Sequence, residues 1–280
     1  MSTDRRLFTM DEIMELFSDA VEEFNDFLGY DFSVEQFVIQ GIVMDENREH
    51  IFEEFCSKHF PYRLIDDYKK DEYYQFIASA FPGKTAAEKQ GILFRMDVEC
   101  GENELYHIML HELAHIYCTH NELGGKIFYD EYCEDYAKDR ELDGQINAGY
   151  GVWREFIAGL IAIECDETCD RCYLFQKKEL INFYKSNINR YDGKLAISKI
   201  LEEVMLSEDM LNAENWQQAE KAIKESNLFE QPIYMEMFKL VYAQLKENYI
   251  SINIEFIKEL GFIYLMILSF SEINRMKEFM

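Results

Sequence analysis

Residues 91–125 read GILFRMDVECGENELYHIMLHELAHIYCTHNELGG, and this stretch decides the fold because two different periodicities meet in it. In its first part, Ile92, Phe94, Met96 and Val98 alternate with a second set of residues that is mostly charged. A period of two is typical of a strand with one face in the core. We therefore predict a half-buried strand over residues 91–99.

The second part of the stretch has the features of a helix. Asn103 can cap the first turn, and Glu104 suits the positive end of the helix dipole. Gly124 and Gly125 can provide a left-handed stop at the other end. We predict a helix over residues 104–121.

The predicted helix carries the sequence H-E-x-x-H at His111, Glu112 and His115. At about 100° of rotation per residue, the two histidines lie within about 40° of each other, on the side opposite an apolar stripe that includes Leu105 and Met109. Two imidazoles one turn apart can bind one zinc ion at about 2.0 to 2.1 Å, with Glu112 beside a bound water. His111 and His115 are therefore candidate zinc ligands, and Glu112 is the candidate catalytic base.

The strand followed by an HELAH helix resembles the zincin class of zinc metallopeptidases, and the likeness covers roughly Gly91 to Ala162. The resemblance implies a zincin-like catalytic core with a small sheet. In that core, 91–99 is an edge strand that borders the active-site cleft and binds an extended peptide. It also implies a third protein ligand from farther along the chain.

Among zincins, the metzincin pattern needs a histidine at position 121, which is Asn121 here, and the nearby His120 is rotated about 140° from His115 on a continuing helix. The gluzincin pattern takes a glutamate from a second helix, and GYGVWREFIAGLIA (149–162) supplies Glu155 among small neighbours that permit close helix packing. Glu155 is the preferred third ligand. Four other glutamates remain competitors: Glu131, Glu134, Glu141 and Glu164.

Other candidate residues are less specific. His107 lies one turn before His111, where it is a further ligand, lines the cleft or orients a neighbouring residue. Tyr106, Tyr129 and Tyr150 can donate to an oxyanion, and that role is left unassigned. The spacing of Cys165, Cys169 and Cys172 matches the cluster-binding motif of radical S-adenosylmethionine enzymes, but the surrounding sequence does not fit that class of enzyme. With Cys133 or His120 they can alternatively form a structural zinc site, or they are simply reduced thiols.

The rest of the chain reads as mostly helical. Thr9 and Glu12 form a capping box ahead of an amphipathic helix, and Ser33 with Gln36 favours helix over strand in residues 34–60. Residues 195–206, 233–245 and 252–270 also have helical periodicity. We predict an α+β, predominantly helical protein, with a catalytic core over 1–170, including a third-ligand helix over 149–165, and an all-helical part over 171–280.

The amino-acid composition disfavours some classes of binding partner. The formal net charge is −26, from 54 acidic against 28 basic residues, which disfavours nucleic acid and anionic membranes. The longest apolar run, 260–268, is far shorter than the roughly 20 residues of a membrane helix. Seven cysteines without an apolar amino-terminal segment favour a soluble cytoplasmic protein with reduced thiols.

These observations lead to one expected function, a zinc-dependent metallopeptidase that binds one zinc ion per chain and acts on a peptide or protein substrate. The alternative is a zinc-binding regulatory protein on a zincin scaffold, either catalytically silent or specific for a single partner.

Overall fold

A computed structural model describes residues 5–63, 66–74, 76–121, 140–166, 217–218, 221 and 255–266. The chain divides into two compact units. The first contains Met1–Asn121 and Ile161–Cys169, and the second contains Glu122–Leu160 and Asp170–Met280. This division differs from the predicted boundary at residue 170, because residues 122–160 group with the carboxyl-terminal residues.

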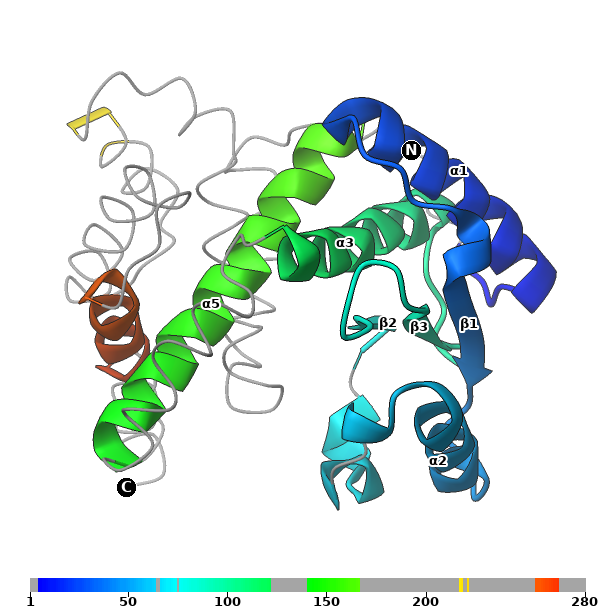
Figure 1. Cartoon of the computed structure of the whole chain (residues 1–280), viewed down its shortest axis with the longest axis horizontal. Coiled ribbons are helices and arrows are strands. Elements are labelled where there is room, and N and C mark those ends of the chain that lie inside the picture. Colours follow the sequence, from blue (N-terminus) through cyan, green and yellow to red (C-terminus); the bar gives the residue numbers. More distant parts are fainter. Residues whose placement is uncertain are drawn as a thin grey trace. The chain divides into compact units, whose positions relative to one another are not determined.

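The first unit holds a three-stranded sheet and three long helices (Figure 1). The strands are β1 (Phe37–Ile42), β2 (Ala78–Phe81) and β3 (Gln90–Arg95), and the helices are α1 (Met10–Leu28), α2 (Arg48–His59) and α3 (Glu102–His120). Short 3₁₀ turns lie at Val34–Gln36, Pro61–Arg63, Asp66–Lys69 and Asp71–Tyr74. The prediction of an α+β, mostly helical fold is confirmed at this level.

The predicted capping box of α1 is confirmed. The Glu12 backbone N–H donates to Thr9 Oγ1, and the Glu12 carboxylate accepts from the Thr9 backbone N–H at 2.8 Å. The helix ends at Gly29, whose φ of 61° lies in the left-handed region that suits glycine. Its apolar stripe, which includes Phe17 and Phe24, is buried.

The Ser33 and Gln36 capping box is also present, but it begins only the 3₁₀ turn Val34–Gln36. The chain then continues as strand β1 and becomes helical again at Arg48. The preference for helix throughout residues 34–60 was therefore wrong for β1. Its strand conformation comes from parallel pairing with β3, in which Phe37 lies opposite Gln90, about 50 residues later in the sequence.

The prediction of an edge strand over 91–99 was also wrong. The strand order is β1-β3-β2, so β3 is central, parallel to β1 and antiparallel to β2. Residues 90–94 are all buried, since α2 lies on one side of the sheet and α1 with α3 on the other (Figure 1). The strand ends at Arg95, and just beyond it the Arg95 guanidinium and the Met44 backbone N–H both bond to Asp97.

An aromatic cluster fills the space between α2 and the sheet. Gly91 on β3 makes room for it, because a Cβ atom at this position would lie 2.5 Å from the Phe60 ring and 2.9 Å from the Phe55 ring. Such distances are shorter than van der Waals contact, so a side chain at this position would force the two rings to shift. The buried members of the cluster are Ile42, Phe52, Phe55, Cys56, Phe60, Tyr68, Tyr74, Phe81 and Leu93.

Helix α5 (Arg140–Cys165) is longer than the predicted helix over 149–165 and runs from the second unit into the first. Residues 255–266 are also helical, within the predicted 252–270. In the second unit these two segments approach closely, since a Cβ atom on Gly149 would lie 2.0 Å from the Ile257 carbonyl oxygen and one on Gly261 1.9 Å from that of Gln145. This packing gives a physical reason why residues 140–160 group with the carboxyl-terminal part. The helices predicted over 195–206 and 233–245 lie outside the described residues.

No helix among the described residues is long and apolar enough to cross a membrane.

Candidate metal centre

Helix α3 carries the H-E-x-x-H residues, and its cap differs slightly from the prediction. It begins at Glu102 with Gly101 as the N-cap, where the Glu104 carboxylate accepts from the Gly101 backbone N–H at 3.1 Å. The helix ends at His120, with Asn121 as the C-cap. Gly124 and Gly125, the predicted stop, lie outside the described residues.

The two histidines are buried. His111 is 6% exposed, His115 is 8% exposed and Glu112, between them, is 8% exposed. The apolar stripe of Leu105 and Met109 is buried as well, so α3 is enclosed on both sides. An ordinary surface helix with solvent-facing histidines is therefore excluded, because polar side chains are buried only where they find polar partners or ligands.

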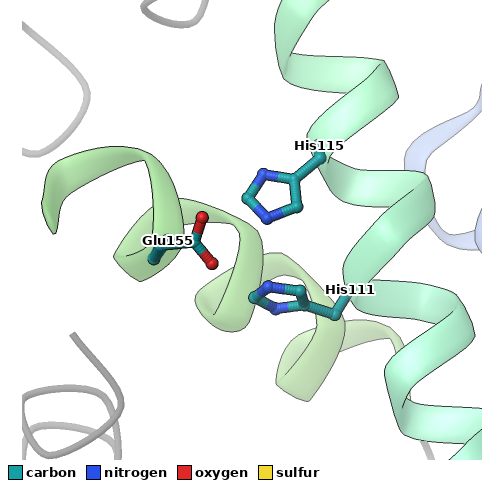
Figure 2. Close-up of side chains that lie close together, drawn as sticks. All are labelled: His111, His115 and Glu155. Carbon is teal, nitrogen blue, oxygen red and sulfur yellow. The ribbon is translucent and has the colours of Figure 1, made fainter. Parts of the chain in front are cut away.

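The imidazoles of His111 and His115 lie on successive turns of α3. Their ring centroids are 4.6 Å apart and the rings are nearly perpendicular, at 86°. Glu155 of α5 joins them. One ligand atom from each of His111, His115 and Glu155 lies within 4.8 Å of the other two. Figure 2 shows the Glu155 carboxylate pointing toward both rings.

This donor set fits zinc. Two nitrogens and a carboxylate oxygen are the ligands of many catalytic zinc sites, which leave the fourth position to water or substrate. Ligand atoms about 2.1 Å from one ion are about 3.4 Å apart in the tetrahedral geometry of zinc sites. The ligand atoms of the group lie within 4.8 Å of one another, so up to about 1.4 Å of closure would bring them to that spacing.

Glu155 also lies beside a charged residue of its own helix. Arg154 Nη2 lies 3.2 Å from Glu155 Oε1, and the side chain of Glu155 is 15% exposed while that of Arg154 is 45% exposed. Solvent screens this pair, so the ion pair holds the carboxylate in place only weakly.

Among the competing glutamates, the structure describes only the side chain of Glu164, and it does not belong to the group of His111, His115 and Glu155. Glu164 is exposed, and at about 100° per residue it lies on the face of α5 opposite Glu155. Glu131 and Glu134 lie outside the described residues, and the side chain of Glu141 is not described.

The other candidate side chains have separate partners. Nε2 of His120 lies 2.9 Å from Oε1 of the buried Gln90, and burial lowers the pKa of His120. Because an amide oxygen only accepts, the imidazole donates this bond. The Tyr106 hydroxyl donates to Glu23 at 2.6 Å, and burial followed by this bond raises the pKa of Tyr106. Tyr150 packs near Trp153, with ring centroids 6.1 Å apart.

The cysteine cluster is described only in part. Cys165 is buried at the end of α5, and burial raises the pKa of its thiol to about 12. Cys133, Cys169, Cys172 and Tyr129 lie outside the described residues, so the predictions made for them stay predictions.

Sequence reasoning missed Asp166, which lies 3.2 Å from His107. One signal was available, because Asp166 follows Glu155 by eleven residues and so lies within about 20° of it on a continuing helix.

No protein-family model, curated protein or solved structure matches this chain.

Proposed function

We propose that this chain is a zinc-dependent peptidase that binds one zinc ion through His111, His115 and Glu155. The observation that supports the proposal is the convergence of these three side chains, two from one helix and one from another, within 4.8 Å. The H-E-x-x-H spacing accounts for the two histidines alone. The presence of Glu155 beside them is the feature that an accidental motif would lack.

A zinc ion held by His111, His115 and Glu155 would lower the pKa of a bound water molecule and polarise the scissile carbonyl of the substrate. Glu112 is the general base, and its carboxylate accepts the proton of the attacking water. The same carboxyl group then donates that proton to the nitrogen of the leaving amine, so Glu112 serves as base and acid in turn. The burial of Glu112 limits competition from bulk water for this proton.

The sheet offers a place for the substrate backbone, although a different one from that expected. The central strand β3 is paired on both sides, whereas β2 lies at an edge of the three described strands and packs against α3. A strand edge presents backbone N–H and C=O groups that an extended peptide can pair with. We therefore propose that the peptide pairs with β2.

Metal content and cleavage of a mixed peptide library, measured on the same purified proteins, test the proposed function. We expect about one zinc per chain in wild type and in Glu112→Gln, and loss of zinc in His111→Ala. Cleavage by Glu112→Gln falls by about 10² to 10⁴-fold, the usual contribution of a general acid–base residue. His50→Ala, on the exposed surface of α2, is the matched histidine control and keeps both properties.

The remaining outcomes discriminate between the candidate functions. Stoichiometric zinc with no cleavage by wild type, and a partner protein bound equally by wild type and Glu112→Gln, would favour the regulatory zinc-binding protein. Absence of zinc after zinc is resupplied would overturn the metal centre and the peptidase together.

A further inference from the structure

The strongest feature outside the proposed zinc ligands is the contact between His107 and Asp166. Nδ1 of His107 lies 3.2 Å from Oδ2 of Asp166, and the two side chains are 23% and 2% exposed. A carboxylate oxygen accepts, so the donor in this pair is the Nδ1–H group of His107. A carboxylate buried to this degree needs such donors, because its desolvation is otherwise unfavourable.

Asp166 directly follows the last residue of α5, and its backbone N–H donates to the Ala162 carbonyl at 2.9 Å. His107 belongs to α3. Both residues lie in the first compact unit, so the bond ties the final turn of α5 to α3 within that unit.

The same two helix faces also carry the proposed zinc ligands. On α3, His107 precedes His111 and His115 by one and two turns, and each step rotates by about 40°. On α5, Asp166 follows Glu155 by three turns with a net rotation of about 20°. The residues between them on this face are small and buried, namely Ala158, Gly159 and Ala162.

We infer that His107 and Asp166 are positioning residues, whose hydrogen bond sets the rotation and register of α5 so that Glu155 reaches His111 and His115. The inference rests on the proposed zinc site. A helix is stiff over three turns, so a directional bond at its end determines where a side chain projects about 16 Å away. Small side chains permit close packing but specify the register of α5 less sharply than a directional bond, and the bond between His107 and Asp166 adds that specification.

A role as a fourth zinc ligand is the competing explanation for His107. Among the described residues, only His111, His115 and Glu155 form a group able to hold a metal, and His107 is not part of it. Its Nδ1 is also engaged with Asp166. The two roles are separable by experiment, because an asparagine side chain can place an N–H donor near the position of Nδ1 but has no second ring nitrogen.

The zinc dissociation constant, measured by competition with a chromophoric chelator, tests the inference. We expect His107→Ala and Asp166→Ala to bind zinc about 10- to 100-fold more weakly than wild type, the usual effect of losing a bond that supports a metal site. His107→Asn stays within about threefold of wild type. His50→Ala and Glu164→Ala, both exposed, are matched controls and bind as wild type does.

A double-mutant cycle with Glu155→Ala decides whether the pair acts through Glu155. If it does, His107→Ala weakens zinc binding in the wild-type background but changes it less than about twofold once Glu155 is absent. The visible spectrum of bound Co²⁺ in His107→Ala should then resemble that of Glu155→Ala.

Three results would overturn the inference. His107→Ala could weaken binding by the same factor in both backgrounds, His107→Asn could bind as poorly as His107→Ala, or His107→Ala could bind zinc normally. In each case wild type still binds zinc, and the proposed function survives. Failure of wild type itself to bind zinc would remove both.

Discussion

Shortening Glu155 by one methylene tests the proposed third ligand most directly. Glu155→Asp withdraws the carboxylate by about 1.5 Å, the length of one carbon–carbon bond. The ligand atoms now lie within 4.8 Å of one another, and this limit would grow to about 6.3 Å. Two atoms that bind one tetrahedral zinc ion at about 2.1 Å are about 3.4 Å apart, so α5 would have to move by up to about 3 Å.

The packing of α5 opposes such a movement. Ala158 and Ala162, on the same face as Glu155, are fully buried, and close-packed interiors resist shifts of this size. In Glu155→Asp, only the imidazoles of His111 and His115 would then remain as protein ligands for zinc. We expect the dissociation constant to rise at least about tenfold, or about 1.4 kcal/mol.

Chelator competition at pH 7.5 measures this change. Glu164→Asp is the matched control, since it makes the same substitution on the exposed, opposite face of α5, and it should bind zinc as wild type does. Wild-type affinity in Glu155→Asp would refute the assignment of Glu155 as a ligand. Equal losses in both variants would show that the effect comes from the helix and not from the carboxylate.

Three further predictions concern stability and thiol reactivity. Gly91→Ala should lower the free energy of unfolding by about 1 to 3 kcal/mol in urea titrations, because its Cβ would lie 2.5 Å from the Phe60 ring. Gly144→Ala, with open space around the new Cβ, should raise it by about 0.4 to 1 kcal/mol, and the opposite signs are the check. The backbone N–H of Thr9, followed by its hydroxyl and by Arg6, lowers the pKa of Glu12 from 4.5 to about 2. The folded state therefore favours the ionised form of Glu12. The difference in stability between wild type and Glu12→Gln should be full above pH 4.5 and should vanish as the pH falls toward 2. Unfolding curves across this pH range measure that difference. Burial raises the pKa of Cys165 to about 12, so iodoacetamide at pH 8 should label it slowly in native protein and quickly after denaturation; equal rates, read by mass spectrometry, would contradict its burial.

Much of the candidate site follows from local sequence because helix geometry is local. The spacing of His111 and His115 places them on one face of any helix, whatever surrounds it. The capping box at Thr9 and Glu12 depends on residues three apart, and it forms as predicted. Glu155 was chosen from its own helical stretch, and the structure brings it beside both histidines.

The arrangement of the sheet could not be predicted from the local sequence pattern. The alternation after Gly91 predicted an exposed face, but β3 pairs with β1, whose residues lie about 50 positions earlier, and with β2 on its other side. Strand order depends on which distant segments meet, and a period of two carries no information about that. Burial on both faces followed from the helices that cover the sheet.

Tertiary structure also decided which polar residues have partners. In the sequence His107, His111, His115 and His120 are four similar histidines spread along one helix. The fold gives His107 a buried carboxylate from beyond the end of α5 and His120 an amide from β3. Helical spacing determined which histidines share a face, whereas the groups opposite that face come from segments up to about 60 residues away and are set only by packing.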